Sequence, residues 1–330
     1  MSSSATRALA VAVVPMETRR DVITELAVSA EQLGYRAFSV AEGWGHDSTV
    51  LLADIARRTS TIQIGTSVLN VWGRSAATMA MSAITLADLS GGRYVLGLGA
   101  GSPVLAEGLH DVAFRDPVHR LETVTRQVRR LLDGHRLDQS ITTGNRALRL
   151  AVTPPAPIPV SVAALGPQAI RVAGRFADAW APFFLPRSKL VQSLETPARD
   201  VAGRLQIWPG IACAVARDTA QARALAAWWI TFYLTTMGPL YPRTLRRLGF
   251  GAEVDAVIEA NPPGTTTPCL PEAARRLVEE LSLCGTPEPA REQLECWYTA
   301  GADLPTLALP PGADPEDLHF VLDAMAPNHA

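Results

Sequence analysis

The chain has 330 residues, of which 48% are hydrophobic, and its 30 lysines and arginines against 32 aspartates and glutamates give a formal net charge of -2. This balance offers no basic surface to nucleic acid, while the hydrophobic content excludes a disordered chain and allows a large core. No apolar run reaches the roughly 20 residues of a membrane span. The four cysteines lack CxxC spacing, which favours reduced thiols in a cytoplasmic protein. We therefore expect a cytoplasmic protein that binds neither nucleic acid nor membrane.

Short apolar runs alternate with longer amphipathic segments, an order that predicts strand–helix units around a parallel sheet. The predicted strands cover residues 9–14, 37–41, 62–69, 94–98, 159–163, 178–181, 207–216 and 304–309. The predicted helices cover residues 18–34, 47–58, a segment ending at 89, 117–132, 167–175, part of 187–204, 219–248 with a break at Gly238 and Pro239, a segment starting at 286, and 315–325. The proline-rich residues 261–271 are predicted to be a loop. Eight such units predict a (β/α)8 barrel as a single domain over residues 1–330, with a helical insertion late in the chain.

In such a barrel, chemistry is expected at the carboxyl ends of the strands. The fourth predicted strand ends in Gly97-Leu-Gly-Ala-Gly-Ser102, which is one glycine short of a dinucleotide-binding G-x-G-x-x-G because Ser102 holds the last position. Glycines in a strand indicate that the backbone passes close to something else. Both a neighbouring strand and a bound planar ligand remain open as that partner.

The segment Ala164-Leu-Gly-Pro167 follows the fifth predicted strand and predicts an anion site. Its glycine permits a tight approach, and Pro167 suits the first position of a helix. The free N–H groups of Gln168 and Ala169, together with the helix dipole, would favour a phosphate there. An ordinary connection between strand and helix is the alternative.

The segment Glu42-Gly-Trp-Gly-His-Asp47 gathers two acids, an indole and an imidazole at one strand end. An indole such as that of Trp44 is costly to leave on a loop unless it packs on something flat. His46 as a surface residue and Asp47 as a helix cap are the simpler alternatives. The six histidines are scattered without ligand spacing, so no metal site is predicted.

Several segments together carry a family resemblance. They are 41–47, 65–70, 85–93, 96–101, 163–167, 173–178, 285–288 and 300–303. These segments resemble the bacterial luciferase-like superfamily, in particular its coenzyme F420-dependent oxidoreductase branch, from the first strand to beyond residue 309. The resemblance implies a (β/α)8 barrel that forms a homodimer and holds a flavin-like ring at the mouth made by the strand ends.

The resemblance also implies which residues hold the cofactor. In relatives a non-proline cis peptide ends the third strand and presses on the ring, and here it would join Ser67 and Val68. The other implied contacts are Asn70, Gly99, Ala100 and Gly101 for the ring, and Leu165, Gly166, Pro167 and Arg187 for the phosphate and acidic tail. Plain surface charge is the alternative for Arg187.

A deazaflavin moves a hydride, so the protein must hold two carbons close together and supply one proton. Glu42 and His46 are the nearest titratable candidates for that proton, with His110 third, and Trp44 would stack on the substrate or wall it. Arg74 would suit an anionic substrate or the acidic tail, with plain surface charge as the alternative. The candidate substrate-binding residues are Trp72, Arg74 and Trp180.

The chain departs from its relatives at several of these positions. Glu42 is followed by Gly43, where many relatives have histidine, and Ala179 stands where glycine is usual. The pair His110-Asp111 replaces what is often His-Gly. The aromatic residues of segment 228–248 predict an oligomer surface or a lid, with core packing as the alternative. These departures bear on the proton donor more than on the fold.

Three functions follow as hypotheses. The first is a coenzyme F420-dependent oxidoreductase that acts on a small organic substrate. The second is an FMN-dependent monooxygenase on the same barrel. The third, suggested by the missing histidine after Glu42, is a barrel that has lost redox chemistry and acts as a binding or cyclising protein.

Overall fold

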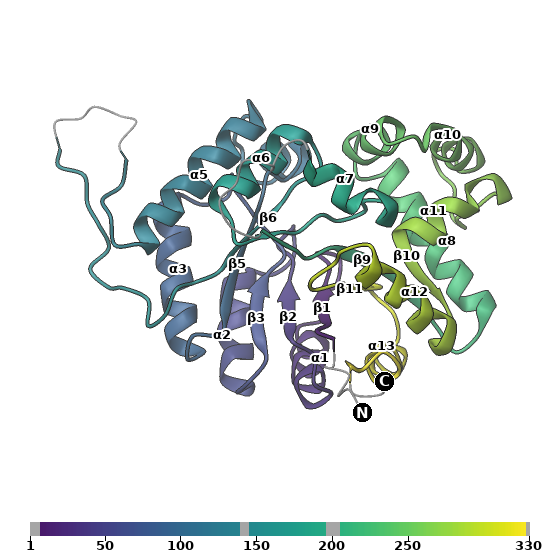
Figure 1. Cartoon of the computed structure of the whole chain (residues 1–330), viewed down its shortest axis with the longest axis horizontal. Coiled ribbons are helices and arrows are strands. Elements are labelled where there is room, and N and C mark those ends of the chain that lie inside the picture. The colour runs from purple at the N-terminus through teal and green to yellow at the C-terminus, as the bar shows by residue number, and fades with distance from the viewer. Residues whose placement is uncertain (1–6, 139–144, 196–204, 328–330) are drawn as a thin grey trace.

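The computed structural model describes residues 7–138, 145–195 and 205–327 (Figure 1). Its strands are β1 (Ala10–Val13), β2 (Ala37–Val40), β3 (Gln63–Thr66), β4 (Leu69–Asn70), β5 (Tyr94–Gly99), β6 (Val160–Ala163), β7 (Ala179–Trp180), β8 (Gln206–Ile207), β9 (Gly210–Val215), β10 (Ser282–Gly285) and β11 (Thr306–Leu309). Its helices are α1 (Arg20–Gln32), α2 (Ser48–Arg58), α3 (Ala76–Leu89), α4 (Pro103–Gly108), α5 (Pro117–Leu132), α6 (Pro167–Phe176), η1 (Arg187–Lys189), α7 (Leu190–Glu195), α8 (Thr219–Thr235), α9 (Leu240–Arg247), α10 (Gly251–Ala260), η2 (Glu272–Ala274), α11 (Arg275–Leu281), α12 (Pro287–Thr299) and α13 (Pro315–Ala324).

The strands close into a parallel ring. Pairing runs from β1 through β2, β3, β5 and β6 to β7. β7 then pairs with β8, which continues as β9 after only Trp208 and Pro209. β9 pairs with β11, and β11 returns to β1. The predicted (β/α)8 barrel is therefore confirmed, with β8 and β9 together forming its seventh strand.

Helix starts follow from local sequence signals. The side chains of Asp47, Ser75, Asp218 and Asp314 accept hydrogen bonds from first-turn N–H groups of α2, α3, α8 and α13. Such caps satisfy donors that have no acceptor inside the helix. Proline begins α5, α6 and α12, where its missing N–H costs nothing. Asp47 thus caps α2, which was one of its two expected roles.

One strand escaped prediction. β10 pairs in parallel with β9, on the edge opposite β11. Its four residues follow α11 directly and end before Thr286, so the sequence contains no separate apolar run that would indicate a strand. The predicted helix within 187–204 is present as η1 and α7 up to Glu195, and residues 196–204 lie outside the described part of the chain.

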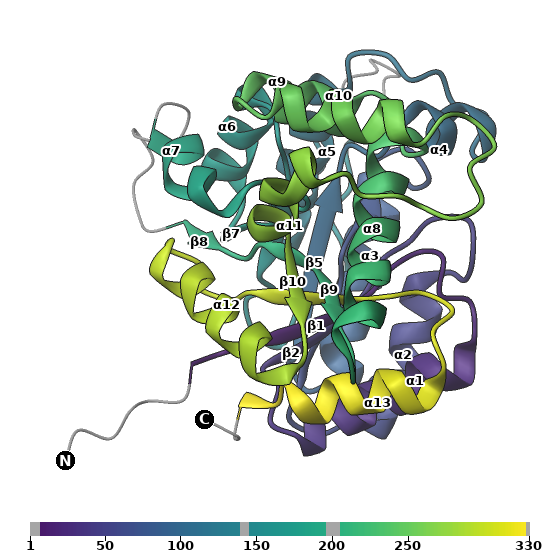
Figure 2. The same cartoon turned by 90° about the vertical axis from the view of Figure 1, so that its right-hand side faces the viewer.

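The predicted helical insertion lies between α8 and β10. The chain turns at Gly238, whose φ of 80° favours glycine, and α9 and α10 then pack beside α8. Figure 2 shows α9 and α10 at one end of the molecule and α13 at the other. Trp229 and Tyr233 of α8 are buried in an apolar cluster with residues of this insertion, as the core-packing alternative expects. An additional lid or oligomer role for this segment stays a prediction.

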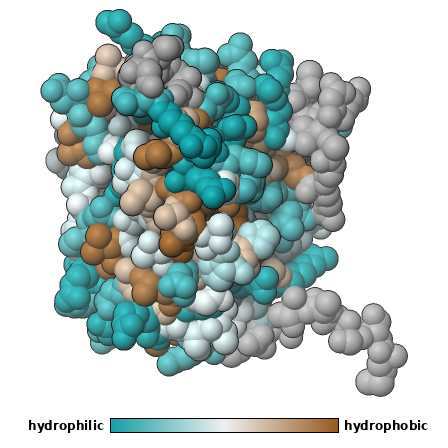
Figure 3. All heavy atoms as spheres, turned by 90° about the vertical axis from the view of Figure 1, so that its left-hand side faces the viewer, coloured by the Kyte–Doolittle hydropathy of each residue, from teal (hydrophilic) through white to brown (hydrophobic). Residues whose placement is uncertain are grey.

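The outer face that carries α3 and α5 is shown in Figure 3, where apolar residues gather among polar ones. Val50 of α2 is 69% exposed, and Met81 of α3 is 55% exposed. α2 and α3 lie side by side. Among the described residues, none of the helices has the length and apolar character needed to cross a bilayer.

Candidate active site

The carboxyl ends of five neighbouring strands form a continuous arc. The N–H of Glu42, after β2, donates to the carbonyl of Val68, after β3, at 3.3 Å. Asn70 of β4 is paired with Gly99 of β5, and Gly99 is paired with Ala163 of β6. The arc therefore brings together the predicted residues of the second to fifth strand ends.

The predicted cis peptide is present between Ser67 and Val68. Ser67 is exposed and Val68 is partly exposed, so this turn lies at the surface of the mouth. The N–H of Ser67 donates to the carbonyl of Val40 at 2.9 Å, which ties the turn to β2. The turn is therefore both accessible to a ligand and held by the neighbouring strand.

The glycines of β5 are explained first by close strand packing. A Cβ on Gly97 would overlap the carbonyl of Thr66, and a Cβ on Gly99 would lie 2.5 Å from Val68 Cγ2. Gly101 has a φ of 64°, a conformation that glycine adopts without strain. The neighbouring-strand alternative therefore accounts for Gly97 and Gly99. A ligand against the outer end of the strand stays a prediction.

A charged network connects the loops after β2 and β4. The Arg74 guanidinium pairs with one carboxylate oxygen of Glu42 and reaches Asp47 Oδ2 at 2.7 Å. The other Glu42 oxygen accepts from the N–H and hydroxyl of Ser48 at 3.1 and 3.0 Å. Burial lowers the pKa of Arg74, but hydrogen bonds and attraction from the two carboxylates outweigh it, so its pKa is raised. Arg74 thus acts first as a clamp between two loops.

The same network fixes the charge of Asp47. Burial raises the pKa of this carboxyl, but hydrogen bonds from Thr49, Val50 and Arg74 outweigh burial and lower the pKa overall. Asp47 therefore stays ionised while it caps α2. Glu42 is 9% exposed, and both of its oxygens already accept hydrogen bonds.

A second network surrounds Asn70. Its Oδ1 accepts from the N–H groups of Trp72 at 3.0 Å and Gly73 at 2.9 Å, and its Nδ2 lies 3.2 Å from His110 Nε2. The indole N–H of Trp72 donates to the Ala100 carbonyl at 2.7 Å. Trp72 is 7% exposed, so most of its ring serves packing. These bonds lock the loop after β4 onto the segment after β5.

The predicted phosphate loop is open on its outer side. A Cβ on Gly166 would meet nothing within 4 Å, and α6 begins directly afterwards at Pro167. Arg247 of α9 donates from Nη2 to the Leu165 carbonyl at 2.9 Å. Sequence reasoning missed Arg247, because it lies 82 residues away in the insertion and no local motif marks it. Glycine, helix N–H groups and an arginine together form a donor set that fits a phosphate.

Trp180 must be corrected as a substrate-binding residue. Its side chain is fully buried, and its indole N–H donates to the Ala164 carbonyl at 2.8 Å. An indole without exposed surface has no face to offer a substrate. Trp180 instead supports the connection that leads into the phosphate loop.

Three other predicted residues lie apart from these networks. Trp44 is 51% exposed on the loop after β2, and its stacking on a substrate stays a prediction. His46 is also exposed, and its Nε2 lies 2.9 Å from the Thr18 carbonyl. Arg187 lies in η1, where the next N–H, that of Ser188, donates to Glu280 at 2.8 Å. Among the described residues no hydrogen bond joins Arg187 to the phosphate loop, and both a contact with the acidic tail and surface charge stay predictions for it.

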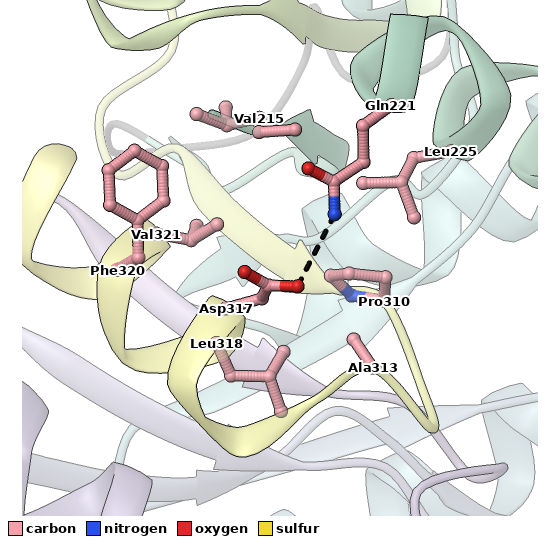
Figure 4. A pocket seen from close by; sticks show the side chains of 10 residues that line it. Val215, Gln221, Leu225, Pro310, Ala313, Asp317, Leu318, Phe320 and Val321 are labelled. Carbon is pink, nitrogen blue, oxygen red and sulfur yellow. Dashed lines mark hydrogen bonds between the residues drawn. The ribbon is translucent and has the colours of Figure 1, made fainter. Parts of the chain in front are cut away.

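A small pocket lies between α8, α13 and the ends of β9 and β11 (Figure 4). Gln221 and Asp317 face each other in it, with Nε2 of Gln221 3.3 Å from Asp317 Oδ2. None of the predicted site residues lines this pocket. In the described part of the chain no three His, Cys, Asp or Glu side chains are grouped to hold a metal.

The chain resembles known proteins over nearly all of its length. Residues 4–304 match the family model described as luciferase-like monooxygenase. A protein of Mycobacterium tuberculosis named as a coenzyme F420-dependent oxidoreductase is 28% identical over 306 residues, which cover 85% of this chain and 88% of that protein.

Solved structures share the fold. The coenzyme F420-dependent tetrahydromethanopterin reductase of Methanopyrus kandleri matches with a TM-score of 0.79 at 18% identity, over 98% of this chain and 99% of that one. The oxygenating constituent of 3,6-diketocamphane monooxygenase from Pseudomonas putida, in complex with FMN, matches with a TM-score of 0.71 at 16% identity, over 97% of each chain. The resemblance seen in the sequence is thereby confirmed: this chain belongs to the luciferase-like monooxygenase family.

Proposed function

We propose that this protein is a coenzyme F420-dependent oxidoreductase that transfers a hydride to or from a small organic substrate. The observation that carries the proposal is the site itself, where an accessible turn at Ser67 and Val68 lies on the same arc of strand ends as an open phosphate loop. The relative named for the deazaflavin cofactor supports the choice of coenzyme F420.

The proposed cofactor site has two parts. The ring lies against the turn at Ser67 and Val68 and the end of β5, and the phosphate lies at residues 165–167. When bound, the deazaflavin supplies the hydride-carrying carbon. The first-turn N–H groups of α6 face the phosphate because they have no acceptor within their own helix. Arg247 adds positive charge beside them.

The chain's own polar groups would manage the proton. Glu42 is the best placed, because it is buried at the arc and hydrogen-bonded to Ser48. A carboxylate can take up or release a proton, and Ser48 holds this one in place from a fully buried position. His46 is exposed, and its Nε2 lies against the Thr18 carbonyl outside the arc. The geometry therefore favours His46 less as the proton donor. Trp44 offers a free indole face to the substrate.

An FMN-dependent monooxygenase is the second candidate. It is favoured by the FMN-bound monooxygenase that shares the fold. Coenzyme F420 and FMN both carry a phosphate on the side chain of the ring, so the loop at 165–167 suits either cofactor. A binding or cyclising protein without redox chemistry is the third candidate.

An anaerobic titration distinguishes the three candidates. Oxidised coenzyme F420 and FMN are added separately to the purified protein, and quenching of their fluorescence is followed. Quenching of the deazaflavin alone is the expected result. Binding of FMN alone would overturn the proposal in favour of the second candidate, and no binding of either would favour the third.

We also propose a homodimer in the cytoplasm. The exposed apolar side chains Val50 and Met81, on the adjacent helices α2 and α3, support an interface with a second copy. Light scattering on the purified protein is expected to give twice the chain mass, and Met81→Glu is expected to lower it. A monomeric wild-type protein would contradict this proposal.

A further inference from the structure

We infer that His110 is a fixed hydrogen-bond donor to a carbonyl oxygen of the bound flavin-like ring, and that Asn70 sets the tautomer that makes it one. The choice of ligand rests on the proposed function. The tautomer rests on the geometry of this chain alone. His110 then has a role different from the proton donor that the sequence suggested.

The orientation of the Asn70 side chain is determined by its neighbours. Two backbone N–H groups, those of Trp72 and Gly73, point at the same atom of the Asn70 amide, at 3.0 and 2.9 Å. An N–H group needs an acceptor, so that atom must be the oxygen. The amide nitrogen is therefore the atom that faces His110, and it can only donate.

This fixed donor determines where His110 carries its proton. Nδ2 of Asn70 lies 3.2 Å from His110 Nε2, so Nε2 must accept. A proton on Nε2 would place two donors against each other. In a neutral imidazole one nitrogen accepts and the other donates, so the proton is on Nδ1.

The imidazole ring is also held in place by packing. A Cβ on Gly73 would lie 2.6 Å from His110 Cε1, which shows how closely the ring covers that backbone. The backbone N–H of His110 donates to the Leu105 carbonyl at 3.1 Å, at the end of α4. The imidazole ring is therefore held by Asn70, by the backbone at Gly73 and by the backbone of His110 itself.

The remaining donor is free to bind a ligand. His110 is partly exposed, and its Nδ1 has no hydrogen-bond partner among the residues that the structure describes. Its neighbour Asn70 lies two residues after Val68 and is paired with Gly99, the elements between which the ring is proposed to bind. A fixed N–H donor at that edge matches a carbonyl oxygen, which both deazaflavin and flavin rings carry.

The same tautomer argues against proton transfer by His110. A neutral imidazole that gave up its Nδ1 proton would become an imidazolate, unless Nε2 gained a proton against the Asn70 donor. His110 is therefore expected to polarise the ring without passing a proton to it. The proton is left to Glu42.

Nitrogen NMR on the ligand-free protein tests the tautomer. Histidine side-chain nitrogens are observed through their carbon-bound protons at about pH 8. The His110 signals are assigned by their loss in His110→Phe. We expect a protonated Nδ1 and a bare Nε2 in the wild-type protein. Asn70→Asp keeps the acceptor for Trp72 and Gly73 but replaces the donor, and is expected to move the proton to Nε2. A wild-type Nε2–H would overturn the inference.

Cofactor binding tests the role. His110→Phe is expected to weaken binding of oxidised coenzyme F420 about tenfold, the effect of one lost hydrogen bond. His110→Gln is expected to restore much of the affinity, because its amide can accept from Asn70 and still donate. The matched control is His135→Phe, which removes an exposed histidine after α5 and should leave the affinity unchanged. Unchanged affinity in His110→Phe would overturn the inference. If the wild-type protein binds neither deazaflavin nor FMN, the proposed function fails while the tautomer is still decided by NMR.

Discussion

The guanidinium of Arg74 forms a nearly buried ion pair with the carboxylate of Glu42, although the two residues follow different strands. Their side chains are 14% and 7% exposed. Because Arg74 also holds Asp47, one side chain fixes the loop after β2 against the loop after β4. The orientation of the proposed proton-transfer group is therefore controlled from a neighbouring strand.

Removing either partner of this pair should destabilise the protein strongly. Arg74→Met and Glu42→Gln are each expected to lower the free energy of unfolding by roughly 3–5 kcal/mol, because each leaves one nearly buried charge without the opposite charge closest to it. The double variant should lose less than the sum of the two. Urea unfolding measures all three, with Arg58→Met, which breaks an exposed pair with Asp54, as a control expected to cost below about 1 kcal/mol. Additive losses would show that the pair does not act as a unit.

The same glutamate should matter more for turnover than for cofactor binding. Glu42→Gln keeps the shape of the side chain but cannot exchange a proton, so the rate of substrate turnover should fall about 100-fold or more. Fluorescence titration should give a cofactor affinity close to that of the wild-type protein. Equal losses in the two measurements would show that Glu42 only positions the cofactor.

Stability should fall in acid because of Glu17. Burial raises the pKa of this carboxyl, but hydrogen bonds from Arg19 and from the Gly312 N–H outweigh it, so the pKa lies below its ordinary 4.5. The folded protein then binds this proton less readily than the unfolded chain. The stabilisation by Glu17 is complete above the ordinary pKa of 4.5 and is lost as the pH falls through the lowered pKa. The free energy of unfolding should therefore decrease from about pH 5 downward, and less steeply in Glu17→Gln. Identical pH slopes in the two proteins would contradict this.

Two glycine substitutions should differ sharply in their cost. Gly97→Ala places a methyl group on the Thr66 carbonyl and should destabilise the protein by roughly 1–3 kcal/mol or more. Gly166→Ala enters open space and should change stability little. Thermal unfolding of both variants is the measurement. A tolerated Gly97→Ala would mean that β3 and β5 can separate at this point.

The bond from Arg247 to Leu165 predicts a selective effect on the cofactor's phosphate. Arg247→Met should weaken binding of coenzyme F420 about tenfold while sparing a deazaflavin that lacks the phosphate and acidic tail. Arg243→Met, one turn earlier on α9, is the matched control and should have a smaller effect. Equal weakening of both ligands by Arg247→Met would assign the residue to loop stability alone.

Local sequence was enough to predict the fold and the strand ends that meet in the arc, while the roles of the site residues stay predictions. Strand periodicity and the glycine, proline and capping signals predicted the barrel, and the cis peptide followed from the family resemblance. Asp47 could be named as a cap because its signal lies within three residues. That residues 1–330 form a single domain stays a prediction.

What sequence could not provide were contacts across the barrel. Arg247 reaches Leu165 from 82 residues away, and His110 reaches Asn70 from 40 residues away, with no pattern to join either pair. Trp180 was misplaced because a two-residue strand has too little alternation to show which side chain is buried. Each of these residues depends on how distant segments pack.

The pairing of β1 with β11 has a consequence for how this protein is made. Ala10 lies beside Thr306, so β1 is synthesised long before its second neighbour in the barrel exists. During that time one edge of β1 has free N–H and C=O groups, which can pair with another chain. Such long-range closure slows folding and exposes intermediates to aggregation. We therefore expect the yield of folded protein to depend on chaperones that protect the nascent chain until residues 306–309 have been synthesised.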